Sequence, residues 1–407
     1  MLRLLAGSSV FVRRATLGAS RRKISTCGFA TFSSNVANTL RPRTGYHSPL
    51  FTSGYANVAG GSRAVGLWLA GCASMVVGSV ILGGITRLTE SGLSMVDWHL
   101  LKGMKPPWTE EEWEEEFKKY QKYPEYKVVH REITLSEFKR IFYMEYAHRM
   151  WGRAIGVAFA IPAAYFWLRG RMPRSMKPRV LIYGSLLLFQ GLLGWFMVKS
   201  GLKENPESVD TVRVSQYRLA VHLGSALILY SLLFWSAHTL LFQPEMLHET
   251  KCLHRLRRAT HVGKAVVFLT ALSGAFVAGL DAGLVYNSFP KMANRWIPDD
   301  ITALDPKWRN VFENPTTVQF NHRVLGTATL VGILGIWLMA RPVGLPRRAR
   351  LAVNCLAGMA GVQVSLGVAT LLCYVPVWMA SLHQTGSVLV LTAVLWLSRE
   401  LKMRTVK

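Results

Sequence analysis

Acidic residues are scarce in this chain and absent from its beginning. The 407 residues include 23 Asp and Glu against 48 Lys and Arg, and the first acidic residue is Glu90. Residues 1–63 contain nine Lys or Arg and many Ser, Thr and Ala. An acid-free, Arg-rich and Ser-rich start is typical of a mitochondrial transit peptide. We therefore interpret residues 1–60 as a transit peptide and flexible N-terminus, with a disordered basic tail as the alternative.

Cysteine is also rare, and its spacing excludes several kinds of site. The five cysteines include no C-x-x-C pair. This spacing gives no indication of a disulfide framework, a zinc site or a c-type haem attachment. The net charge of +25 does not indicate nucleic acid, because the basic residues gather in the N-terminal segment and in short loops between apolar runs.

Long apolar runs are abundant, and they set the fold class. About eight of them approach the ~20 residues that cross a bilayer. The expected spans are residues 64–85, 146–168, 180–198, 217–241, 262–282, 320–340, 351–373 and 377–397. The sequence therefore predicts an all-α integral membrane protein with eight transmembrane helices. A soluble protein would need eight buried core helices of nearly equal length.

Positive charge alternates from loop to loop and predicts the orientation. Loops 169–179, 251–264 and 341–350 are strongly basic, whereas 199–213 and 284–318 mix both signs. Basic loops stay on the side of insertion, which for a mitochondrial protein is the matrix. We expect a multi-pass protein of the mitochondrial inner membrane with both termini in the matrix.

The chain repeats itself at a distance of about 170–190 residues. Gln190-Gly-Leu-Leu-Gly matches Gln363-Val-Ser-Leu-Gly at a shift of 173, and Ser91-Gly-Leu resembles Ala282-Gly-Leu. An even number of spans per repeat makes the repeats parallel. We expect two four-helix-bundle halves, residues 61–242 and 262–398, related by a pseudo-twofold axis along the membrane normal.

Four histidines occupy matched positions near the start of the even-numbered spans. His148 and His322 lie 174 residues apart, and each is followed two spans later by another histidine, His222 or His383. Histidine within a membrane span is costly without a partner. Two imidazoles from facing helices can supply both axial ligands of a haem iron. The pattern predicts two haem sites, although a structural hydrogen bond would explain any one histidine alone. Small residues one turn deeper, Gly152, Ala226, Gly326 and Ser387, would clear a slot for a macrocycle.

Charged neighbours of the first histidine in each pair differ between the halves. Arg149 and Arg323 follow the histidines and are candidates for contacts with haem propionates, or for snorkelling to headgroups. Glu145 lies three residues before its histidine, where the other half has Gln319. A carboxyl beside only one haem suggests one reactive site, with Glu145 handling protons, and one electron-handling site. An ordinary interfacial carboxylate is the alternative.

The remaining polar features are less specific. Segment 86–145 contains an acidic stretch, Glu110 to Tyr120, which predicts a short amphipathic helix on the membrane surface or against the bundle. We interpret the other six histidines as solvated or interfacial: His99, His130, His238, His248, His254 and His261.

Taken together, these motifs resemble the haem A synthase family. The resemblance rests on E-x-x-H-R at 145–149, H-R at 322–323 and the histidines at 222 and 383, with residues 83–98 and 278–290 similar to the mitochondrial branch. It covers residues 64–398. It implies oxidation of a haem O methyl group to a formyl group, which gives haem A for cytochrome c oxidase.

The resemblance also implies cofactors and partners. His148 and His222 would hold the substrate haem with Glu145 catalytic, and His322 and His383 would hold a permanent haem b that passes electrons. Ferredoxin and its reductase would donate electrons, with haem O synthase and cytochrome c oxidase assembly factors as further partners. The sequence leaves the existence of a homo-oligomer open. Two rival interpretations are a di-haem cytochrome that only transfers electrons, and a transporter, which would be expected to have broken helices.

Overall fold

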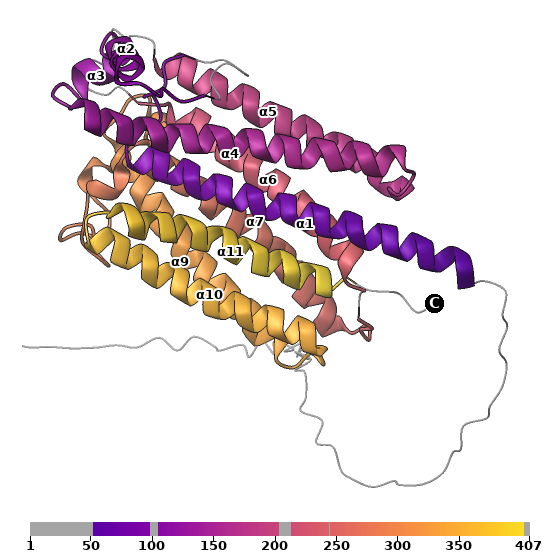
Figure 1. Cartoon of the computed structure of the whole chain (residues 1–407). Helices are drawn as coiled ribbons and strands as arrows, with labels where there is room; N and C mark the ends of the chain where they lie inside the picture. The colour runs from indigo at the N-terminus through magenta and orange to yellow at the C-terminus, as the bar shows by residue number, and fades with distance from the viewer. Residues whose placement is uncertain (1–51, 98–104, 203–212, 244, 403–407) are drawn as a thin grey trace, which may run out of the picture. The chain divides into compact units, whose positions relative to one another are not determined.

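The computed structural model describes residues 52–97, 105–202, 213–243 and 245–402, with side chains described from residue 62 onward. Within these ranges the chain is helical and contains no β-strand (Figure 1). Eight of its helices are long and apolar enough to cross a membrane. They are α1 (Thr52–Leu88), α4 (Leu135–Leu168), α5 (Lys177–Gly201), α6 (Gln216–Leu241), α7 (Lys251–Gly279), α9 (Pro315–Ala340), α10 (Arg347–Leu372) and α11 (Val377–Glu400). The expected number of spans is confirmed. Residues 1–51 lie outside the described residues, so the transit peptide stays a prediction.

Three helices, α1, α4 and α7, begin more than ten residues before the apolar runs from which they were predicted. Helix α4 begins at Leu135, where Thr134 and Glu137 form a capping box, and α7 begins at Lys251 after the N-cap Thr250. A capping box satisfies backbone N–H groups of the first turn and so fixes where a helix starts. The apolar run marks only where the helix becomes hydrophobic. The expectation that all four repeated histidines lie within the first two turns is therefore wrong for His148, which follows Leu135 by 13 residues.

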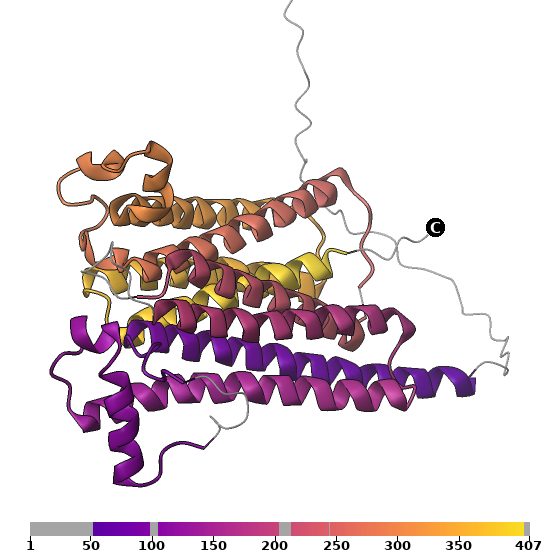
Figure 2. The ribbon, with the colours of Figure 1, turned by 90° about the horizontal axis from the view of Figure 1, so that it is seen from above.

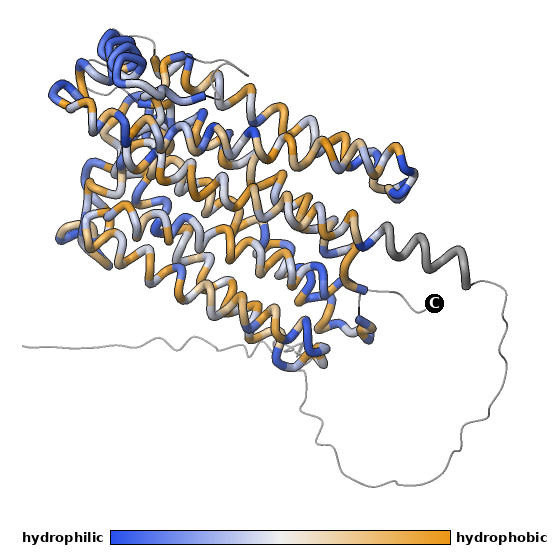
Figure 3. The backbone as a smooth tube through the Cα atoms, viewed as in Figure 1, coloured by the Kyte–Doolittle hydropathy of each residue, from blue (hydrophilic) through white to orange (hydrophobic). Residues whose placement is uncertain are grey.

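Each half of the chain is a ring of four helices. In the N-terminal half α1 packs against α4, α4 against α5, α5 against α6, and α6 against α1. In the C-terminal half the neighbours are α7 with α9, α9 with α10, α10 with α11, and α11 with α7. Helices α4 and α6 therefore lie diagonally opposite each other, as do α9 and α11. Hydrophobic residues predominate along these helices, and hydrophilic residues gather at both ends (Figure 3).

The two halves meet along helices that occupy equivalent places in each ring. Helix α1 contacts α11, α7 contacts α6, and α6 contacts α11 (Figure 2). Polar bonds support this apolar interface: the hydroxyl groups of Tyr230 and Thr392 lie 2.5 Å apart, and Gln384 Nε2 donates to the Val80 carbonyl over 2.7 Å. In the two repeats α1 corresponds to α7 and α6 corresponds to α11. The contact of α1 with α11 is therefore equivalent to that of α7 with α6, and the packing fits the two-repeat arrangement.

A small cap covers the end of the bundle at which α4, α6, α9 and α11 begin (Figure 1). Its helices are α2 (Glu110–Tyr120) and α3 (Pro124–Val128). The capping box of Thr109 and Glu112 starts α2. Trp113 and Tyr120 are buried and pack with Phe138, near the start of α4. The amphipathic helix expected from the acidic stretch is present.

Candidate functional site

The four repeated histidines lie on the diagonal helices of the two rings. His148 is on α4 and His222 on α6, whereas His322 is on α9 and His383 on α11. All four helices begin at the capped end of the bundle, so the histidines share that end. Each of the four residues is partly exposed. The predicted pairs are thus on helices that face each other across a bundle, as a pair of axial ligands must be.

Each of these imidazoles rests against a glycine of a neighbouring helix. A Cβ added at Gly83 would lie 3.0 Å from His148 Nε2, and one at Gly367 would lie 2.6 Å from His383 Cε1. The four facing pairs are Gly83 with His148, Gly194 with His222, Gly274 with His322, and Gly367 with His383. Gly83 and Gly367 provide space that the rings occupy, whereas a Cβ at Gly274 or Gly194 would lie 3.4 or 3.7 Å from the ring, in ordinary van der Waals contact. Sequence reasoning missed this role, although Gly194 and Gly367 end the repeated motifs that it quoted.

The imidazole rings of His322 and His383 face each other closely. Their centroids are 6.3 Å apart, and their planes are almost perpendicular at 88°. Two imidazoles on opposite sides of one metal atom, with metal–nitrogen bonds of about 2 Å, place their centroids roughly 6 Å apart. An edge-to-face pair of aromatic rings can show the same distance between centroids. The hydrogen bonds of the ring nitrogens therefore bear on whether the rings bind a metal or only pack against each other.

A hydrogen bond holds Nδ1 of His322. Ser273 Oγ lies 2.7 Å from His322 Nδ1 and 2.8 Å from the Thr270 carbonyl. When the hydroxyl donates to Thr270, its oxygen accepts from Nδ1–H, and the lone pair of Nε2 is free to bind a metal. Metal-bound histidines commonly hold their second nitrogen in this way. The residues present thus fit a haem iron bound between His322 and His383.

The surroundings of the histidines suit a porphyrin better than a bare metal ion. In the described part of the chain, no three His, Cys, Asp or Glu side chains gather as a metal site. Haem iron takes four ligands from its porphyrin and needs only two from the protein. One turn deeper than His148 and His322, a Cβ added at Gly152 or Gly326 would meet nothing within 4 Å. These two positions of the expected slot are open.

Glu145 is buried one turn before the arginine that follows His148. Its Oε2 accepts from Ser94 Oγ and from the backbone N–H of Met95, each at 2.8 Å. Its Oε1 accepts from Arg149 Nε at 3.0 Å and Nη2 at 2.5 Å. Arg149 also donates to the carbonyls of Met95 and Asp97, at 2.8 and 3.2 Å. Glu145 and Arg149 therefore tie the loop after α1 to helix α4.

The hydrogen bonds by which Glu145 and Arg149 join the loop to the helix are here called the clasp. The same clasp is present in the other half, with an amide in place of the carboxylate. Arg323 donates to the carbonyls of Tyr286 and Ser288, each at 2.9 Å, and to Gln319 Oε1 at 3.1 Å. Gln319 Nε2 donates to the Ala282 carbonyl over 2.8 Å. An amide can donate to the loop directly, whereas a carboxylate can only accept. This is why Glu145 uses the Ser94 hydroxyl, which the repeat replaces with Val285.

Both arginines predicted to contact propionates are occupied mainly by this clasp. The guanidinium of Arg149 is nearly buried and bonded to Glu145 and the loop. In Arg323, Nε is buried and has no hydrogen-bond partner among the described residues. The propionate contacts stay predictions, and Arg323 offers the more available donor.

The cap holds a second buried carboxyl, which sequence reasoning did not single out. Glu125 is 4 % exposed, and Tyr120 Oη lies 3.1 Å from its Oε2 and 2.8 Å from His130 Nδ1. Burial, with a smaller contribution from the charge of Glu145, raises the pKa of Glu125 to about 8. Burial lowers the pKa of His130. Tyr120 Oη donates to Glu125 and is within hydrogen-bonding distance of His130 Nδ1, so the three side chains form a hydrogen-bonded chain.

The interpretation of the remaining histidines as solvated or interfacial is wrong for His238. It is buried, and its Nε2 lies 3.3 Å from Oε1 of the buried Glu400. The pairing was not visible in the sequence because the partners are 162 residues apart and meet only when α11 packs against α6. His248, His254 and His261 are exposed. His130 belongs to the cap chain, and His99 lies outside the described residues.

Comparison with known proteins assigns the family. Residues 66–395 match the family model COX15-CtaA, described as cytochrome oxidase assembly protein. The chain is 58 % identical to Heme A synthase COX15 of Bos taurus over 340 residues, 84 % of this chain and 82 % of that one. It is 46 % identical to Heme A synthase COX15 of Arabidopsis thaliana over 354 residues, 85 % of this chain and 77 % of that one. It is 43 % identical to Heme A synthase of Nitrosospira multiformis over 340 residues, 84 % of this chain and 94 % of that one. These matches reach from the first candidate span to the last, and the chain belongs to the COX15-CtaA family of cytochrome oxidase assembly proteins.

Proposed function

We propose that this protein is a haem A synthase, an oxidoreductase that converts a methyl group of haem O to the formyl group of haem A for cytochrome oxidase assembly. The observation that carries the proposal is the pair of diagonal histidine sites within a chain of this family. Bound haem would supply the redox chemistry. The protein supplies the axial imidazoles, a bundle interior that excludes water, and the polar groups beside each site.

The two sites have different roles in this proposal. His148 and His222 hold the substrate haem in the N-terminal half, and His322 and His383 hold a resident haem b that passes electrons. The hydrogen bond between Ser273 Oγ and His322 Nδ1 supports ligation through Nε2 in the C-terminal half. The matched helix positions and facing glycines extend the argument to the N-terminal half.

Glu145 is the proposed catalytic residue. It is three residues before His148 and therefore on the same side of α4. A buried carboxylate there can accept a proton released at the substrate site and return it to the capped end of the bundle. Arg149 and Ser94 keep it oriented. Gln319 cannot take this role, which agrees with an electron-handling site in the other half.

The proposed setting is the mitochondrial inner membrane, with both termini in the matrix. The eight candidate spans and the alternation of basic loops support this orientation. Ferredoxin and its reductase would supply electrons, and haem O synthase would supply the substrate.

A di-haem cytochrome that only transfers electrons is the competing function, because the matched halves suit it equally. Mass spectrometry of the haems in the purified protein separates the two functions. Haem O or haem A together with haem b supports the synthase. Haem b alone, with no conversion of added haem O under reducing conditions and oxygen, supports the cytochrome.

A further inference from the structure

The two histidine pairs differ in what holds their Nδ1 atoms. In the C-terminal half, His322 Nδ1 is bonded to Ser273, and Gln363 Nε2 lies 3.1 Å from His383 Nδ1. In the N-terminal half, His222 Nδ1 is buried and has no hydrogen-bond partner among the described residues. The repeat places Leu82 where the C-terminal half has Ser273. Leu82 has no hydroxyl to offer an imidazole.

The glutamines that match in the two repeats point to different partners. Gln363 also donates to the His383 carbonyl over 2.8 Å. Its counterpart Gln190 donates instead to Ser225 Oγ over 2.6 Å. Ser225 and Gly386 occupy the same place, three residues after the second histidine of each pair. The two halves therefore differ at one small residue, which is Ser225 on α6 in the N-terminal half and Gly386 on α11 in the C-terminal half.

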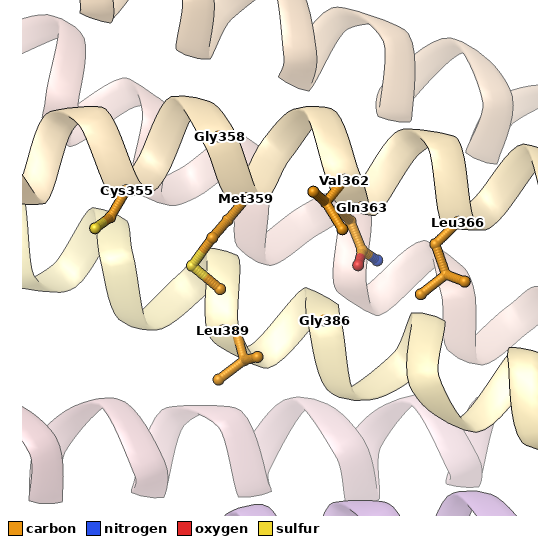
Figure 4. A pocket seen from close by; sticks show the side chains of 8 residues that line it. All are labelled: Cys355, Gly358, Met359, Val362, Gln363, Leu366, Gly386 and Leu389. Carbon is orange, nitrogen blue, oxygen red and sulfur yellow. The ribbon is translucent and has the colours of Figure 1, made fainter.

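Gly386 creates the space that Gln363 needs. Figure 4 shows Gln363 between α10 and α11 beside Gly386, in a cavity of about 310 Å³ with largely apolar walls. A Cβ at residue 386 would overlap Gln363 Oε1. That oxygen is buried and has no hydrogen-bond partner among the described residues. The Nε2 atom of the same carboxamide donates to the His383 carbonyl and lies 3.1 Å from His383 Nδ1, so Gln363 holds the imidazole ring in position.

We propose that Ser273 and Gln363 are positioning residues that make the C-terminal half retain its haem, and that Gly386 leaves the space that Gln363 needs. In the N-terminal half, Ser225 prevents the equivalent contact with the histidine, so that this half can release its product. The inference rests on the proposed haem ligation. A hydrogen-bonding partner at Nδ1 fixes the orientation of the imidazole ring, and such partners typically contribute 10- to 100-fold in metal affinity. At His322, where Ser273 can accept from Nδ1–H, the bond also raises the basicity of Nε2, stabilises ferric over ferrous iron and so lowers the reduction potential. A synthase needs this asymmetry because one haem must stay and the other must leave.

The test exchanges the two small residues in the full-length protein purified with its haems. Gly386→Ser should displace Gln363 from His383 and speed the loss of haem b to excess apomyoglobin by about 10- to 100-fold. Ser273→Ala should do the same through His322 and should also raise the midpoint potential of haem b. Ser225→Gly should slow haem release from the N-terminal half, because Gln190 can then reach His222. Ser225→Ala is the matched control, because it removes the hydroxyl but keeps the Cβ.

The outcomes separate this inference from the proposed function. If His322→Ala leaves haem b in place with an unchanged spectrum, the ligand assignment fails and the inference with it. If His322→Ala loses haem b but Gly386→Ser and Ser273→Ala keep wild-type release rates and potentials, the inference alone is overturned. A changed potential in a variant whose circular dichroism and yield match the wild type supports it, since loss of packing alone would not produce that combination.

Discussion

Replacing Glu145 with Gln separates catalysis from loop anchoring, because the repeat already shows how an amide works in the same clasp. The carboxylate accepts four hydrogen bonds, three of them over 2.8–3.0 Å. Each bond to a charged group contributes about 1.5–3 kcal/mol. Glu145→Gln alone therefore loses both the charge and part of the clasp. If the residue handles protons, haem A formation should fall roughly 10²–10⁴-fold, which is about 3–5 kcal/mol in the barrier.

A second variant removes the ambiguity. Glu145→Gln combined with Ser94→Val copies the pairing of Gln319 and Val285, in which the amide donates to the loop carbonyls itself. The double variant should recover thermal stability and haem content relative to the single one, yet remain as inactive. Haems are extracted from membranes of each variant, and haem O, haem A and hydroxylated intermediates are separated by chromatography. Restored haem A output in the double variant would show that Glu145 serves only as a clasp, and the catalytic proposal would be withdrawn.

Three further predictions follow from the site and the cap. His322→Ala and His383→Ala should each lose the haem b spectrum and all activity, and a full six-coordinate signal in either would rule out the ligand assignment. A methyl group at Gly83 would lie 3.0 Å from its facing imidazole and one at Gly194 would lie 3.7 Å away, so Gly83→Ala should lower haem content more than Gly194→Ala, and equal losses would contradict this ranking. Because the pKa of Glu125 is raised from 4.5 to about 8, the folded cap keeps a proton that the unfolded chain releases, and stability should fall between about pH 4.5 and 8, by up to ~1.4 kcal/mol per pH unit. Glu125→Gln should flatten this slope in thermal unfolding followed by tryptophan fluorescence, and an unchanged slope would refute the assignment.

The periodic features of the fold could be predicted from the sequence. Eight apolar runs gave eight candidate spans, and the spacing of His148 and His322 located equivalent helices because a repeat preserves position along the chain. The residues at which the helices begin were harder to predict, because capping residues such as Thr134 lie outside the apolar runs. The contact of His238 with Glu400 depends on which helices touch, and periodicity does not contain that information.

The candidate site was predictable in composition but not in its hydrogen bonding. The sequence suggested that the Glu145–Gln319 difference marks chemistry, and the structure adds that Ser94 changes together with it. Such compensation is visible only when the loop is seen against the helix. The role of the facing glycines could not be predicted from the sequence either. The absence of a side chain at a glycine becomes meaningful only when the imidazole ring that lies beside it is known.

The position of α11 has a consequence for the order in which the protein is built. This helix contacts α1, α6, α7 and α10, and it follows the other seven candidate spans in chain order. It is therefore the last of the eight to be synthesised. Before α11 is present, α1 and α6 lack a shared neighbour and the C-terminal ring is open on one side. The bundle, and with it the pocket that needs His383, can close only after α11 has been made, so insertion of the cofactor follows synthesis of all eight spans.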